Sequence, residues 1–135
     1  MPAAPPPIQP DHWLYRLSSA DWLAAAETEL RHTEEALARR AIRPAVTHAR
    51  RAAGMAWNAV LVTAFDDRYG RSYMDHVVAL ANDTAAPDAV REAAQRLRDT
   101  PAAPPQLIQL GKADPTALQA ARTILEHART RAAAP

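Results

Sequence analysis

Apolar residues recur at steps of three and four along most of the chain, a spacing that places side chains on one face of an α-helix. The first such segment begins near Ser18 or Ser19, either of which can cap a helix, and Asp21 lies in its first turn. We expect this helix to end before Ile42-Arg43-Pro44, because proline disfavours the helical conformation of the residue before it. Its buried face is predicted to hold Trp22, Leu23, Ala26, Leu30, Leu37 and Ala41.

The second segment is apolar on nearly every side. We expect a helix that starts with Pro44 at its first position and runs to about Phe65. Because the part from Ala52 to Ala64 has almost no polar face, this helix is predicted to be the most buried one. Gly54 allows a neighbouring helix to approach closely.

The remaining chain predicts three more helices. A polar loop over 66–71 is followed by a short helix over 73–81, for which Ser72 is the expected N-cap and Asp75 completes an acidic capping box. A fourth helix starts with Pro87 at its first position and stops before Thr100-Pro101, and a last one runs over 116–131. The sequence therefore predicts an all-α fold, a compact bundle of about five helices, one of them short.

Composition sets the limits of this domain. Five prolines fall within the first ten residues, so we expect residues 1–17 to form an extended arm, residues 18–131 a single bundle domain and residues 132–135 a frayed end. The absence of cysteine excludes disulfides and thiolate chemistry. The net charge of +1 supplies no global attraction for nucleic acid. With no apolar stretch long enough for a membrane span, we expect a cytoplasmic protein without a membrane partner.

A polar stripe on the second helix is the first candidate site. His48, Arg51 and Asn58 share one helix face with Met55 and Val62. A polar group buried there needs a partner, since leaving it unpaired costs several kcal/mol, on the order of 2–7. One interpretation is structural, with Arg51 and Asn58 satisfied by the Asp66-Asp67 loop or by Asp75. The other is a ligand-binding stripe.

The second candidate site is the loop that follows this helix and the start of the next one. Loops held by rigid helices often carry binding residues, and tyrosines offer stacking faces. With Arg50 and Arg51, the loop arginines are predicted to form a local anion-binding patch. The candidate ligand-binding residues of this segment are Asp67, Arg68, Tyr69 and Tyr73, with Arg71 and His76 as candidates for catalysis.

Two elements of the form Arg-x4-His occur, Arg71–His76 and Arg43–His48. Together with the helical pattern and the alanine-rich segment His48–Met55, they resemble HEPN domains, small all-α modules found with nucleotidyltransferases and in toxin–antitoxin systems. In the ribonucleases of that family, the Arg and His of such an element meet across a dimer and cleave RNA without metal. The resemblance implies that Arg71 stabilises phosphate charge and that His76 is a general acid or base.

Metal or cofactor chemistry is less favoured by the pattern. His48, His76, Asp66, Asp67 and Asp75 are ligand types, but no Glu-x-x-His or His-x-x-x-His pair occurs among them. We expect His32 and the pair Glu126-His127 to be solvated on helix surfaces. The chain has three glycines and no phosphate-binding loop or nucleophile elbow. We therefore predict no metal and no cofactor.

Three functional hypotheses follow. The first is a HEPN-like domain that binds nucleotide or RNA, either a metal-independent ribonuclease or its accessory. The second is a non-catalytic interaction or oligomerisation module, with a partner protein or a second copy of the chain, because the alanine-rich helix faces allow close packing. The third is a small-molecule or metal enzyme that uses the stripe of His48, Arg51 and Asn58.

Overall fold

Helices form all the regular structure that a computed structural model of the chain describes, which covers residues 13–101 and 114–133. The all-α prediction is confirmed, with five α-helices and no strand among these residues. Two short 3-10 helices accompany them. The elements are η1 (Trp13–Arg16), α1 (Ser19–Ala38), α2 (Ile42–Thr63), η2 (Asp67–Tyr69), α3 (Tyr73–Ala81), α4 (Asp88–Asp99) and α5 (Thr116–Ala133).

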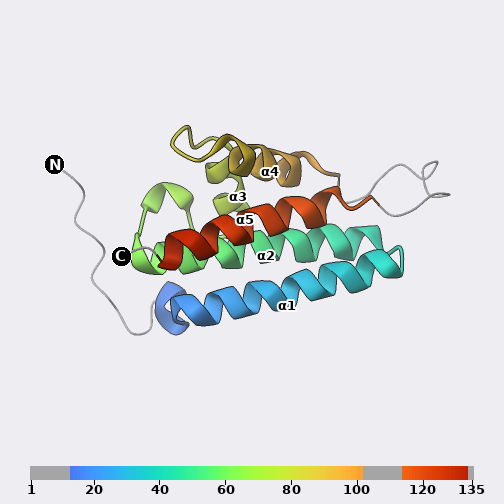
Figure 1. Cartoon of the computed structure of the whole chain (residues 1–135), viewed down its shortest axis with the longest axis horizontal. Coiled ribbons are helices and arrows are strands. Elements are labelled where there is room, and N and C mark those ends of the chain that lie inside the picture. The colour runs from blue at the N-terminus through green and yellow to red at the C-terminus, as the bar shows by residue number, and fades with distance from the viewer. Residues whose placement is uncertain (1–12, 102–113, 134–135) are drawn as a thin grey trace.

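Helix α2 lies at the centre of the bundle. Helices α1, α2 and α5 run side by side along the long axis, and α3 and α4 pack across one side of them (Figure 1). Every residue of α2 from Ala52 to Leu61 is buried. This agrees with the lack of a polar face in the same stretch of sequence, since a helix that is apolar all round must be covered on all sides.

Local capping fixes where two of the helices begin. The Ser18 hydroxyl accepts a hydrogen bond from the Asp21 amide, with 3.1 Å between the atoms, at the start of α1. Ser72 accepts in the same way from the Asp75 amide at 3.0 Å, and the Asp75 carboxylate accepts from the Ser72 amide. The predicted capping box is therefore present, and α3 spans the predicted residues.

The turn between α1 and α2 differs from the prediction. Helix α1 ends at Ala38, and Arg40 adopts a left-handed backbone conformation with φ 57°. Helix α2 begins at Ile42, so Pro44 lies at its third position and not its first. Proline is tolerated there because amides in the first turn of a helix have no partner within the helix. Similarly, Pro87 is the N-cap of α4 and lies just before its first residue.

The folded part begins earlier than residue 18. Leu14 in η1 is completely buried, and its carbonyl oxygen accepts a hydrogen bond from Trp22 Nε1 at 2.9 Å. The extended arm therefore does not reach residue 17 as predicted. Burial of Leu14 holds η1 against the bundle, although the residues before it are rich in proline. At the other end, α5 continues through Ala132 and Ala133. The rest of the predicted arm, residues 1–12, and residues 134–135 lie outside the described residues.

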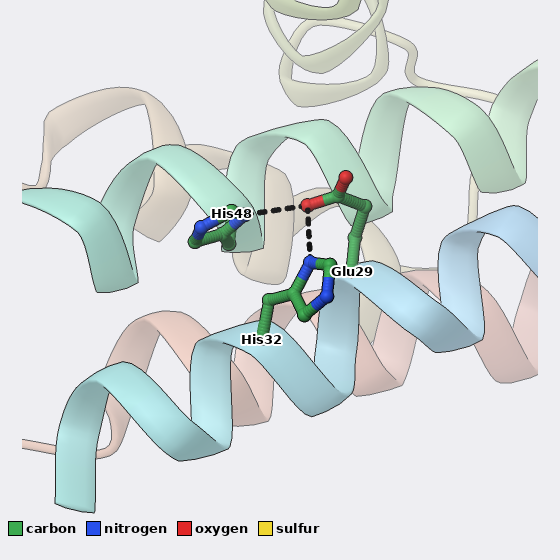
Figure 2. A group of neighbouring side chains, drawn as sticks. All are labelled: Glu29, His32 and His48. Atoms are coloured by element: carbon green, nitrogen blue, oxygen red, sulfur yellow. Dashed lines mark hydrogen bonds and ion pairs between the residues drawn. The ribbon is translucent and has the colours of Figure 1, made fainter.

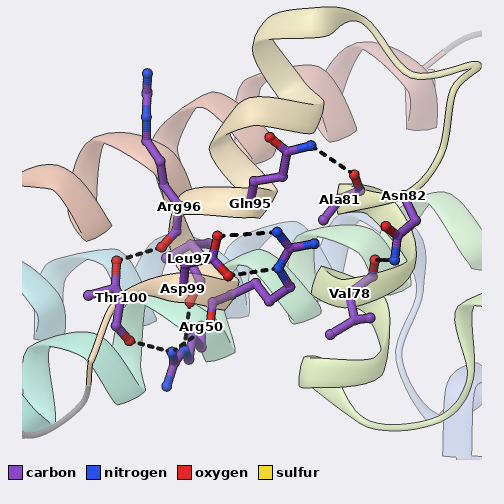
Figure 3. A network of polar contacts seen from close by, with 10 residues as sticks. Arg50, Val78, Ala81, Asn82, Gln95, Arg96, Leu97, Asp99 and Thr100 are labelled. Carbon is purple, nitrogen blue, oxygen red and sulfur yellow. Dashed lines mark hydrogen bonds and ion pairs between the residues drawn. The ribbon is translucent and has the colours of Figure 1, made fainter.

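Arg50 ties α2 to the end of α4. Its Nε donates to the Leu97 carbonyl at 2.9 Å, and its Nη2 donates to the Thr100 carbonyl at 2.7 Å (Figure 3). These carbonyls lie at a helix end, where no amide within the helix can satisfy them. Gln95 links α4 to α3 in the same region, since its Nε2 donates to the Ala81 carbonyl at 3.2 Å.

Glycine is required where α2 meets α3. A Cβ atom on Gly54 would lie 2.3 Å from the Cβ of Tyr73 and 2.6 Å from its Cα. The two helices therefore approach closely at this point, as the sequence predicts for Gly54. None of the helices in the described ranges combines the length and the apolar character that a membrane span needs.

Candidate functional site

His76 and Asn58 form a buried polar pair between α3 and α2. His76 is 1% exposed and Asn58 0%. The Nε2 atom of His76 lies 2.7 Å from Asn58 Oδ1, and its Nδ1 lies 2.7 Å from the Tyr69 carbonyl oxygen. The Trp13 ring stacks against the imidazole with 6.1 Å between ring centres. Both ring nitrogens are thus engaged by the protein.

The protonation of His76 follows from this environment. Desolvation lowers its pKa below the usual value, and it outweighs the hydrogen bond to Tyr69 and the charge of Asp75, which raise the pKa. A neutral imidazole donates one hydrogen bond and accepts one. Because the Tyr69 carbonyl can only accept, Nδ1 of a neutral His76 donates to it and Nε2 is left as an acceptor. The Asn58 amide must then be turned over, so that its NH₂ group and not Oδ1 meets Nε2. In this geometry the ring is buried and both of its nitrogens are used within the protein.

Arg71 does not converge with His76. Its side chain is exposed, whereas the imidazole points inward to Asn58 and the Tyr69 carbonyl. Its backbone amide donates to Asp75 Oδ2 at 3.2 Å. Within this chain the two candidates of the Arg-x4-His element therefore share no site.

Arg71 does line a pocket, which we call the aromatic pocket. It is an open, largely apolar cavity of about 620 Å³ between η1, α1, α2 and the start of α3. A volume of this size is typical of small-molecule sites. The aromatic pocket is lined by Trp13, Arg16, Leu17, Trp22, Asn58, Arg71, Ser72 and Tyr73.

The polar groups of the aromatic pocket are incompletely satisfied. One end of the Asn58 amide contacts His76, and the other end is buried with no hydrogen-bond partner among the described residues. Arg16 and Arg71 are exposed, and neither guanidinium has an acidic partner within residues 13–101 and 114–133. A buried amide without a partner is costly, which makes Asn58 a candidate binding group of this pocket.

The first two residues of the polar stripe, His48 and Arg51, meet Glu29 of α1. The His48 Nδ1 atom lies 2.6 Å from Glu29 Oε2, and Arg51 Nη2 lies 3.4 Å from Glu29 Oε1. The prediction that the Asp66-Asp67 loop or Asp75 satisfies Arg51 and Asn58 is therefore wrong. His48 and Arg51 contact Glu29, whereas Asn58 contacts His76 in the interior.

Sequence reasoning missed Glu29. The residue is 7% exposed, although glutamate is rarely buried. Its spacing from Trp22 and Ala26 places it on the apolar face of α1, and this signal was available in the sequence. Glu29 and His32 also form a Glu-x-x-His pair, which was overlooked because His32 was expected to be a solvated surface residue.

The other loop candidates face a different part of the molecule. Arg68 pairs with Asp66 at 2.6 Å, and the Tyr69 hydroxyl donates to Asp83 at 2.6 Å. Burial and this bond to a carboxylate raise the pKa of Tyr69. Arg68 and Tyr69 line a smaller cavity of about 180 Å³, separate from the aromatic pocket, and Asp67 is exposed on η2.

The predicted arginine patch is not assembled. Arg50 is bound to carbonyl groups of α4, Arg51 to Glu29 and Arg68 to Asp66. Of the four arginines, Arg71 alone lacks a side-chain partner among the described residues. Arg71 is therefore the member of the predicted patch that is left for an anion, and it lines the aromatic pocket together with Arg16.

The fold and site together define a helical-bundle protein with a buried polar pair beneath an aromatic pocket. No protein-family model, curated protein or solved structure matches the chain.

Proposed function

We propose that this protein binds a nucleotide unit, either free or within single-stranded RNA, in the aromatic pocket. The observation that carries the proposal is an apolar pocket lined by Asn58, whose buried amide has one unsatisfied end, and by two arginines without acidic partners among the described residues. This combination matches a ligand with a flat apolar body, polar edges and an attached anion.

Each part of the pocket fits one part of a nucleotide. The rings of Trp13, Trp22 and Tyr73 offer surfaces on which a base stacks. The Asn58 amide offers a hydrogen bond to the edge of the base. The guanidinium groups of Arg16 and Arg71 offer charge-assisted hydrogen bonds to phosphate. Because the net charge is only +1, these local cations supply the attraction.

The proposal retains the nucleotide or RNA association implied by the resemblance to HEPN domains, and it leaves out cleavage. His76 reaches the pocket only through Asn58, and both of its ring nitrogens are engaged. The interaction-module hypothesis has less support, because Val78 is the one large apolar side chain that is exposed among the described residues.

Binding can be measured with AMP and with a short fluorescent single-stranded RNA, by tryptophan fluorescence and by anisotropy at low salt. Arg71→Ala is expected to weaken binding by about tenfold or more, since hydrogen bonds to charged groups contribute about 1.5–3 kcal/mol. Tyr73→Ala is expected to weaken it by about five- to 150-fold, from roughly 1–3 kcal/mol of stacking. Circular dichroism checks that both variants fold.

Arg43→Ala is the matched control, because Arg43 is an exposed arginine at the start of α2. It is expected to bind like the wild-type protein. If neither ligand binds at low salt, or if Arg43→Ala loses as much affinity as Arg71→Ala, the proposal is wrong. Binding of AMP as well as RNA indicates a mononucleotide site, and binding of RNA alone indicates a site for a strand.

A further inference from the structure

We propose that Glu29, His32 and His48 bind a divalent transition-metal ion, Zn²⁺ by preference, between α1 and α2. The site shares no residue with the aromatic pocket and does not depend on the function proposed for it. It combines an i, i+3 pair on α1, Glu29 and His32, with a histidine of the facing helix (Figure 2).

The donor atoms already lie close together. One ligand atom from each residue can be chosen such that all three lie within 4.8 Å of one another. Glu29 Oε2 is 2.6 Å from His48 Nδ1 and 3.7 Å from His32 Nδ1. Bonds of about 2.0–2.2 Å to a tetrahedral Zn²⁺ place ligand atoms roughly 3.3–3.6 Å apart. The observed distances lie on either side of this range, so small side-chain rotations suffice.

An unsatisfied nitrogen points independently to a missing ligand. His32 Nδ1 is buried and has no hydrogen-bond partner among the described residues, since Glu29 at 3.7 Å is too distant. The Glu29 side chain beside it is nine-tenths buried. A metal ion between them would use the lone pair of His32, which is costly to bury without a partner, and together with Arg51 it would neutralise the buried carboxylate.

Arg51 is compatible with the ion because it occupies the other carboxylate oxygen. Its Nη2 lies 3.4 Å from Glu29 Oε1, which leaves Oε2 for the metal. Carboxylates that bind a metal commonly receive such a second contact, which fixes their orientation.

The donor set selects the kind of metal. Two imidazole nitrogens and one carboxylate oxygen suit zinc and its first-row neighbours, whereas Ca²⁺ and Mg²⁺ prefer oxygen ligands alone. The His32 and His48 side chains are 43% and 28% exposed, so the outer side of the site faces solvent. Three protein ligands and an exposed fourth position correspond to a zinc ion that carries a water molecule.

The test is equilibrium dialysis of the full, tag-free chain against Zn²⁺, together with visible absorption spectra on addition of Co²⁺. The wild-type protein is expected to bind one ion per chain and to give a tetrahedral Co²⁺ spectrum. His48→Ala and Glu29→Gln are each expected to weaken binding by at least about tenfold. Glu35→Gln, which removes an exposed carboxylate of α1, is the matched control and should bind normally.

Thermal unfolding keeps the test decisive if Glu29→Gln does not fold. Zn²⁺ is expected to raise the Tm of the wild-type protein, because an ion that binds only the folded state stabilises it. His32→Ala alters a half-exposed side chain and should fold, but its Tm should not respond to Zn²⁺. The proposal is overturned if wild-type protein binds no stoichiometric Zn²⁺, or if His32→Ala and His48→Ala bind it as the wild type does.

Discussion

At the scale of single residues, the buried polar side chains matter most, because each of them needs a hydrogen-bond partner. Asn58 donates to one ring nitrogen of His76, and the backbone carbonyl of Tyr69 accepts from the other. The pair joins α2, η2 and α3 at one point. Its protonation is therefore linked to folding.

Stability is predicted to fall as the solution becomes acidic, owing to His76. Its pKa in the folded protein lies below the ordinary histidine value of 6.5, because desolvation disfavours the charged ring. Below about pH 6.5 the unfolded chain therefore binds the proton more readily, and the free energy of unfolding decreases as the pH falls toward the pKa of the folded state. Urea denaturation between pH 7.5 and 5 measures this slope.

A variant without the titrating ring isolates the contribution of His76. His76→Gln is expected to be less stable at pH 7.5 but to lose less stability on acidification. His127 contributes in the same direction, since burial and the nearby Arg131 lower its pKa, so the double variant His76→Gln/His127→Gln should have the smallest slope. An unchanged slope in His76→Gln would refute the assignment.

At the scale of elements, local signals fix helix starts better than helix ends. Ser18 and Ser72 mark the starts of α1 and α3, because a cap depends only on residues within one turn. The turn at Arg40 was not predicted, since a non-glycine residue with positive φ has no strong sequence signature. η1 was missed because its stability comes from burial of Leu14 by distant parts of the chain.

Gly54→Ala tests the close approach of α2 and α3. An added methyl group would overlap Tyr73, so we expect a loss of about 1–3 kcal/mol in the free energy of unfolding. The sign of this change in the free energy of unfolding is informative. Without the overlap the substitution would stabilise the protein, since alanine is favoured over glycine in a helix by about 0.8–1.0 kcal/mol. Urea denaturation measures the change.

The control is the reverse substitution at an exposed helical site. Ala24→Gly in α1 meets no packing constraint and should lose only about 0.8–1.0 kcal/mol, the difference in helix propensity. If Gly54→Ala proves as stable as the wild type or more stable, α2 and α3 are not in the close contact described.

At the scale of the whole molecule, the sequence predicts which residues share a helix face but not which faces meet. His48, Arg51 and Asn58 do lie along one side of α2, as their spacing indicates. Their partners, Glu29 and His76, come from other helices, and no local pattern encodes that pairing. The aromatic pocket also joins residues from Trp13 to Tyr73, which only the packed bundle brings together.

The most direct test of the central claim is a two-dimensional NMR titration of ¹⁵N-labelled protein with AMP and with a short single-stranded RNA. We predict that chemical shift changes concentrate on the side-chain amide of Asn58, the indole NH groups of Trp13 and Trp22, and the backbone of Arg71. The indole of Trp57, which lines the smaller cavity, should not move. An absence of changes, or changes centred on Trp57, would contradict nucleotide binding in the aromatic pocket.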